Sequence, residues 1–107
     1  MRESESLIRI LITTVNALDV AKNIARKIIE NKLAACVNII PVDSVYYWEN
    51  RIEEKEFMLL IKTSKERVEA LRDWIANNHP YNVPEILLVS AESNKEYFNW
   101  LIGYIKE

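Results

Sequence analysis

Glycine, cysteine and histidine each occur only once in this chain of 107 residues, and each scarcity excludes a kind of chemistry. With Gly103 as its only glycine, the chain lacks the several glycines that Walker and dinucleotide phosphate loops need. With Cys36 as its only cysteine, it cannot form an internal disulfide, and a reducing cytoplasm is the expected location. His79 is the only histidine, and spacing marks no nucleophile as its partner. We therefore expect a protein that is not an enzyme and has no organic cofactor.

The chain also lacks a strong excess of one charge and a long apolar run. Its net charge of −2 argues against a nucleic acid or an acidic membrane as a partner. The apolar run near the N-terminus is short and is interrupted by Arg9, so we expect neither a signal peptide nor a membrane span. Half of the residues are apolar and 28% are charged, which is typical of a soluble globular protein. The length predicts a single domain over residues 1–107.

The longest strand-like stretch in the sequence, residues 33–63, predicts a β-hairpin. Its first arm covers residues 33–48, its turn residues 49–51 and its second arm residues 52–63. A straight first arm would be roughly 50 Å long at about 3.3 Å per residue. A compact chain of this length has a diameter of only about 34 Å. The hairpin must therefore project beyond the body or bend, and Pro41 is the expected bend because proline fixes φ and has no N–H.

Four large apolar residues stand at the tip of this hairpin: Val45, Tyr46, Tyr47 and Trp48. Exposed aromatic side chains usually mark an interface, and the edges of unpaired strands favour association with another chain. We therefore expect the tip to pack against copies of the same protein. The alternative is that the arm folds back and its aromatic residues fill the chain's own core.

The flanking segments alternate between strands and helices. Apolar residues at 7–14 and 86–91 indicate two buried strands. Helical spacing indicates three helices, with expected N-terminal caps at Asn16, at Thr63 with Glu66, and at Ser93 with Glu96. The resulting order, βαββαβ plus a C-terminal helix, predicts an α+β ferredoxin-like fold, with an antiparallel sheet covered by helices on one face. A partner subunit is the simplest cover for the other face.

Few residues are candidates for chemistry. The imidazole of His79 could bind copper or zinc, or it could be structural beside Pro80. Glu54 and Glu56 share one face of the second hairpin arm, where they could contribute to a cation site or be solvated. Lys62 could bind an anionic ligand or form an ion pair.

Five segments resemble the CutA divalent-cation tolerance family: KLAACVNIIP (32–41), SVYYWENRIEEKEF (44–57), LLIKT (59–63), HPYNVPEI (79–86) and YFNWL (97–101). The resemblance covers essentially the whole chain. It implies a cytoplasmic homotrimer of ferredoxin-like subunits, joined through long β-hairpins and linked to tolerance of copper and other divalent cations. The architecture is also similar to that of the PII signalling proteins, which bind small effectors between subunits.

The resemblance leads to specific expectations about the site. We expect Cu²⁺ or another divalent cation to bind His79, with Glu56 as an oxygen ligand. Four residues are expected to line a nearby cleft between subunits: Trp48, Lys62, Tyr81 and Glu85. The alternative is a PII-like sensor that holds an anionic metabolite with Lys62 and the loop at 79–85.

The sequence departs from the family pattern at several positions. Val42 and Asn50 stand where the family usually has glycine, and Asn50 tolerates the positive φ that a tight turn needs. Thr13 and Asn78 stand where some relatives have a cysteine and a second histidine. These differences leave His79 as the only imidazole for a metal.

Overall fold

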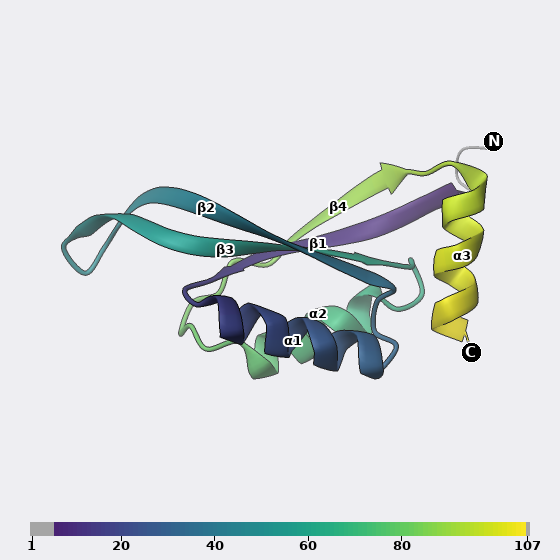
Figure 1. Cartoon of the computed structure of the whole chain (residues 1–107), viewed down its shortest axis with the longest axis horizontal. Coiled ribbons are helices and arrows are strands. Elements are labelled where there is room, and N and C mark those ends of the chain that lie inside the picture. Colours follow the sequence, from purple (N-terminus) through teal and green to yellow (C-terminus); the bar gives the residue numbers. More distant parts are fainter. Residues whose placement is uncertain (1–5, 107) are drawn as a thin grey trace.

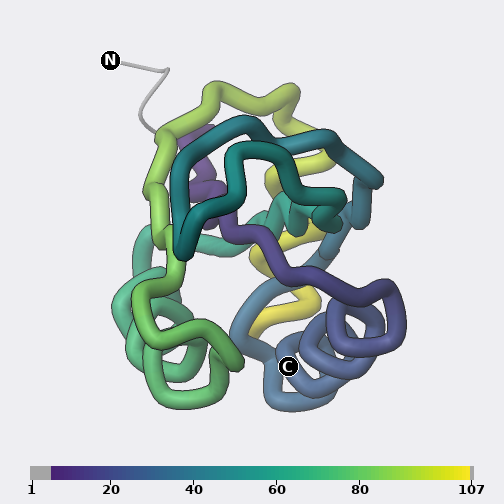
Figure 2. The backbone as a smooth tube through the Cα atoms, turned by 90° about the vertical axis from the view of Figure 1, so that its left-hand side faces the viewer, coloured from purple at the N-terminus to yellow at the C-terminus, as the bar shows by residue number. Residues whose placement is uncertain are grey.

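A computed structural model describes residues 6–106 and has seven elements (Figure 1). They are β1 (Leu7–Val15), α1 (Leu18–Glu30), β2 (Cys36–Trp48), β3 (Arg51–Thr63), α2 (Val68–Asn78), β4 (Leu87–Glu92) and α3 (Lys95–Lys106). The strands form one antiparallel sheet in the order β2-β3-β1-β4. Helices α1 and α2 lie side by side under one face of this sheet (Figure 2), and α3 stands at one end of it. The predicted ferredoxin-like fold with a C-terminal helix is confirmed.

The predicted hairpin is formed by β2 and β3, and it projects beyond the helices (Figure 1). The molecule is 48 Å long as a result. Its turn consists of Glu49 and Asn50, with φ angles of 52° and 66°, because a two-residue turn between twisted strands needs left-handed residues. The hydroxyl of Tyr47 donates to Asn50 Oδ1 at 2.7 Å. Arg51 already belongs to β3, so the turn is one residue shorter than predicted.

Pro41, the expected bend, does not interrupt the pairing of β2 with β3. Pro41 pairs with Phe57 in an uninterrupted register, and the irregularity lies between Val45 and Trp48. Because β2 is an edge strand, a proline without an N–H is tolerated there and the ladder does not have to break.

The core lies between the sheet and the two helices beneath it. Residues from β1, β3, α1 and α2 contribute its fully or nearly fully buried side chains: Leu11, Val15, Ile24, Ile28, Leu59, Ile61, Leu71 and Ile75. A second cluster, in which Leu101 and Ile105 of α3 pack against Ile8 and Ala35, fixes α3 to the end of the sheet.

The three predicted helix caps are wrong. Ala17, not Asn16, occupies the N-cap position of α1. The hydroxyl of Thr63 donates to the carbonyl of Leu33 at 2.7 Å instead of capping α2, which begins only at Val68. A buried hydroxyl needs a partner, and for Thr63 the tertiary bond satisfies that need.

The cap predicted for α3 is also replaced by a local contact. The hydroxyl of Ser93 donates to the carbonyl of Asn94 at 2.9 Å, while the side chain of Asn94 contacts Glu96 Oε1 at 3.4 Å. Serine and asparagine side chains form such local bonds readily, so the motif identified a helix start without forming the reciprocal pair.

The sheet face opposite α1 and α2 remains largely uncovered in the single chain. Strand β4 was predicted to be buried, but Leu87 is 49% exposed and Val89 is 43% exposed because β4 is an edge strand. The hairpin tip is also open, with Val45 and Tyr47 each 69% exposed. The tip aromatics therefore do not fill the chain's own core. Within residues 6–106, no helix is both long and apolar enough to cross a membrane.

Candidate functional site

A cavity of about 710 Å³ lies where the hairpin meets the end of β1 and the loop between α2 and β4. Its walls come from segments far apart in the sequence. They include Thr14 near the end of β1 and Asn16 just after it, Glu56 and Met58 on β3, and Tyr81 in the loop. The antiparallel pairing of β1 with β3 brings the first two groups together, since Thr14 is the register partner of Met58.

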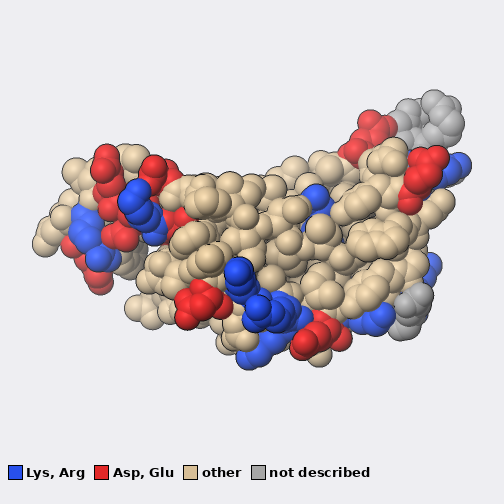
Figure 3. All heavy atoms as spheres, in the orientation of Figure 1, with Lys and Arg blue, Asp and Glu red and all other residues tan. Residues whose placement is uncertain are grey.

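The cavity is acidic. Its lining includes four carboxylates, those of Glu49, Glu54, Glu56 and Glu85, and one guanidinium, that of Arg51. Arg51 Nε lies 2.8 Å from Glu54 Oε2, so this cation is already paired. Charged side chains gather on the same projecting hairpin in Figure 3. A formal excess of three negative charges favours cations over anions.

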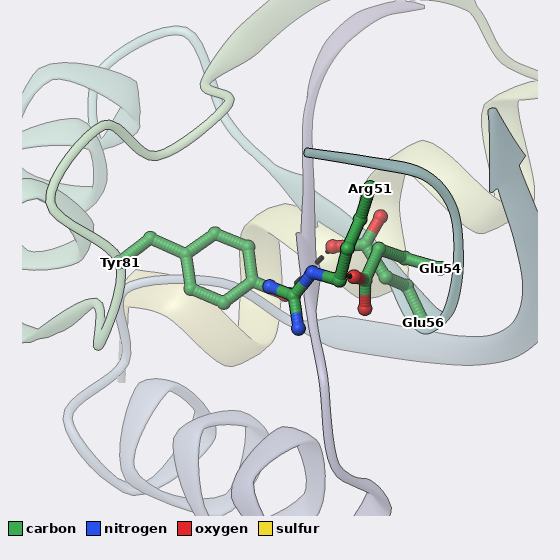
Figure 4. Close-up of polar contacts among 4 residues, drawn as sticks. All are labelled: Arg51, Glu54, Glu56 and Tyr81. Carbon is green, nitrogen blue, oxygen red and sulfur yellow. Dashed lines mark hydrogen bonds and ion pairs between the residues drawn. The ribbon is translucent and has the colours of Figure 1, made fainter. Parts of the chain in front are cut away.

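Glu56 and Tyr81 form the central polar contact of the cavity (Figure 4). The hydroxyl of Tyr81 donates to Glu56 Oε2 at 2.6 Å. Glu56 is only 4% exposed, and carboxylates are rarely so buried without a partner. Burial, together with the hydrogen bond to Glu56, raises the pKa of Tyr81 far above its usual value. Tyr81 therefore acts as a hydrogen-bond donor to the carboxylate.

His79 lies next to this pair, with both of its ring nitrogens in hydrogen bonds. Nδ1 accepts the backbone N–H of Tyr81 at 3.1 Å. Nε2 lies 2.9 Å from the carbonyl of Thr14 and 3.0 Å from the hydroxyl of Thr13. Because Nδ1 accepts, the proton of a neutral ring is on Nε2, which donates to the Thr14 carbonyl. Burial lowers the pKa of His79, against the opposing effect of the Thr14 bond, and the neutral ring is favoured.

The structure brings together most of the residues predicted for the site. Glu56, Trp48, Tyr81 and Glu85 line the same cavity. Lys62 does not line it. Lys62 is paired with Cys36 near the other end of β3, and its Nζ lies 5.8 Å from the ring centroid of Tyr97.

Three of the four predicted interface residues, Val45, Tyr46 and Trp48, also line the cavity. Glu49 and Arg51, which the sequence placed in the turn at 49–51, also line the cavity. For Glu49 the signal was the acidic composition of the hairpin, which by itself does not distinguish a cavity wall from a solvated strand.

Among residues 6–106, no three histidine, cysteine, aspartate or glutamate side chains are arranged to hold a metal ion. A metal on either nitrogen of His79 would have to displace a hydrogen bond. The assignment of His79 and Glu56 as metal ligands stays a prediction. For His79, metal binding would require the loss of one of these hydrogen bonds.

The fold and the cavity define a small ferredoxin-like protein with an acidic cavity of ligand size, lined in part by a projecting hairpin. Residues 9–103 match the family described as CutA1 divalent ion tolerance protein, and the chain belongs to this family. The resemblance seen in the sequence motifs is thereby confirmed.

Two relatives illustrate the range of the family. The chain is 42% identical over 95 residues to the divalent-cation tolerance protein CutA of Thermus thermophilus, covering 86% of this chain and 92% of that protein. It is 45% identical over 85 residues to human protein CutA, covering 77% of this chain. The chain spans only 48% of the human protein's length.

Solved structures of relatives share the fold. CutA from Synechococcus elongatus matches with a TM-score of 0.88 and 36% identity, over 94% of this chain and 91% of that one. The same protein complexed with a Bis-Tris molecule matches with a TM-score of 0.85 and 36% identity, over 92% and 94%. The periplasmic divalent cation tolerance protein CutA from Archaeoglobus fulgidus matches with a TM-score of 0.84 and 34% identity, over 92% and 98%.

Proposed function

We propose that this protein binds divalent cations in the acidic cavity, with copper as the principal ion, and acts in metal tolerance as a homotrimer. The observation that carries this proposal is the excess of carboxylates around the buried Glu56. Carboxylate oxygens bind divalent cations, and among first-row ions copper(II) binds a given site most strongly. Water, loop carbonyls or a neighbouring subunit would complete the ligand set.

Two features support self-association. The sheet has edge strands at β2 and β4, and Leu87 and Val89 expose apolar surface on β4. The tip residues Val45 and Tyr47 are exposed as well. Partner subunits would cover both surfaces, and the number three follows the family resemblance. Light scattering should give three times the subunit mass of 12.6 kDa.

We also propose that the protein acts by binding rather than by catalysis, and in the cytoplasm. The family is described as a tolerance protein, and the only imidazole has both nitrogens in hydrogen bonds. The unpaired cysteine supports a reducing compartment. Cell fractionation would test the location, because the Archaeoglobus relative is described as periplasmic.

Calorimetric titration with Cu²⁺ tests the cation site. Glu56→Gln removes the charge but keeps an oxygen that can accept the Tyr81 hydroxyl. We expect it to weaken Cu²⁺ binding at least about tenfold, equivalent to about 1.4 kcal/mol. The matched control is Glu53→Gln, which removes an exposed carboxylate on the same strand outside the cavity. Equal binding by the wild type and Glu56→Gln would show that the cavity is not the site.

A second candidate function is a PII-like small-molecule sensor, which the size of the cavity favours. Cavities that hold small molecules are commonly about 300–1,000 Å³, and aromatic residues Tyr46, Trp48 and Tyr81 line this one. A solved structure of the Synechococcus relative is complexed with Bis-Tris, which is an amine. An anionic metabolite would need Lys62 from a neighbouring subunit, because Lys62 lies outside the cavity of its own chain.

A thermal-shift screen separates these ligand classes. The acidic lining predicts stabilisation by amines rather than by nucleotides or organic acids. Stabilisation by an anion, lost in Lys62→Met, would establish the anionic version. Stabilisation by amines alone would exclude it.

A further inference from the structure

We propose that His79 is a positioning residue that fixes Tyr81 against Glu56, and that it does not bind the metal itself. The consequence for cation binding rests on the proposed function. The positioning role rests on geometry alone, in the contacts from β1 through His79 and Tyr81 to β3.

His79 continues the hydrogen bonding of β1 beyond the end of β4. The register between β1 and β4 ends at the pair of Ile12 with Leu87. Thr13 and Thr14 therefore have no partner on β4, and Nε2 of His79 lies within 3.0 Å of the Thr13 hydroxyl and 2.9 Å of the Thr14 carbonyl. Both threonines are buried, so loss of the imidazole would remove a hydrogen-bond partner from the Thr13 hydroxyl and the Thr14 carbonyl, at a cost in stability.

The other ring nitrogen fixes the loop. Nδ1 accepts the N–H of Tyr81 at 3.1 Å, and the two rings pack edge to face with centroids 4.8 Å apart. This arrangement points the phenol of Tyr81 across the cavity to Glu56, at 2.6 Å. His79 and Tyr81 of the loop thus connect Thr13 and Thr14 on β1 to Glu56 on β3.

A metal ion bound to His79 would break the hydrogen bonds that hold Tyr81 against the carboxylate of Glu56. On Nε2 it would replace the proton that Thr14 accepts, and on Nδ1 it would replace the N–H of Tyr81. Either loss would loosen Tyr81. Residues that orient a ligand, rather than bind the metal, commonly affect metal affinity about 10–100-fold.

Rescue by glutamine distinguishes positioning from ligation. His79→Gln supplies one amide donor and one acceptor without an imidazole, whereas His79→Ala supplies neither. In calorimetric titrations with Cu²⁺, we expect His79→Gln to bind within about threefold of the wild type and His79→Ala to bind about tenfold more weakly. Asn77→Ala, exposed on α2, is the control and should match the wild type. Equal losses in His79→Gln and His79→Ala would overturn the proposal.

A spectroscopic measurement on the wild type keeps the proposal testable even if a variant fails to fold. The ¹⁵N chemical shifts of the imidazole should report the Nε2–H form and stay unchanged during titration with the diamagnetic ion Zn²⁺. A proton on Nδ1, or a ring nitrogen whose shift follows Zn²⁺, would overturn the positioning role. If the wild type binds neither Cu²⁺ nor Zn²⁺, the proposed function fails, and the Nε2–H form of the ring still decides the positioning role.

Discussion

Removing the hydroxyl of Tyr81 tests how strongly the loop is held to the cavity wall. Tyr81→Phe keeps the ring and its packing on His79 but removes the donor that lies 2.6 Å from Glu56 Oε2. Glu56 is 4% exposed, so the carboxylate gains little solvation in exchange. A hydrogen bond to a charged group contributes about 1.5–3 kcal/mol, and we expect the variant to lose that much free energy of unfolding.

The assay is denaturant unfolding of the wild type, Tyr81→Phe, Glu56→Gln and the double variant at one protein concentration, because association stabilises the folded chain. Because Glu56→Gln keeps an acceptor for the Tyr81 hydroxyl, the double-mutant cycle isolates the part of the contact that depends on the charge of Glu56. Its coupling energy should be about 1 kcal/mol. Tyr47→Phe is the matched control. It removes an exposed hydroxyl bonded to Asn50 at 2.7 Å and should cost less than about 0.5 kcal/mol. A coupling energy near zero, or equal losses in Tyr81→Phe and Tyr47→Phe, would show that the Tyr81–Glu56 hydrogen bond does not hold the loop to the cavity wall.

Three further predictions concern stability. Burial lowers the pKa of His79 in the folded state. The stability that His79 contributes is therefore fully present above its unfolded pKa of about 6.5 and is lost as the pH falls through its lower folded pKa. Thermal unfolding should show this loss in the wild type but not in His79→Gln. Asn50 has a φ of 66°, so Asn50→Val should destabilise the hairpin by about 1–2 kcal/mol in denaturant unfolding and Asn50→Gly should not. Leu71 is fully buried, and Leu71→Ala should cost about 2–5 kcal/mol in the same assay.

The sequence predicted those features that depend on local pattern. Alternation of apolar residues from residue 33 to residue 63 predicted the hairpin, and the positive φ of Asn50 was expected from its tolerance of that region. The apolar stripe of α2, with Leu71 and Ile75 buried, followed from helical spacing. Each of these sequence patterns lies within a few residues of the structural feature that it predicts, so a single sequence is enough to make the prediction.

Features that depend on distant contacts could not be read in this way. Nothing local indicates that Thr63 bonds to Leu33 rather than capping α2. The apolar composition of β4 predicted burial, but burial depends on a cover that this chain does not supply itself. His79 was expected to be available because histidine binds metals, whereas its partner Thr14 stands 65 residues away. The assembly of Glu56 with Tyr81 likewise depends on the sheet register.

Native mass spectrometry of the wild type and Glu56→Gln, each with and without Cu²⁺, tests most directly whether a cation is held at the acidic cavity. We expect a particle of three 12.6 kDa subunits that retains copper in the wild type and loses most of it in Glu56→Gln. The same copper content in both proteins would contradict it.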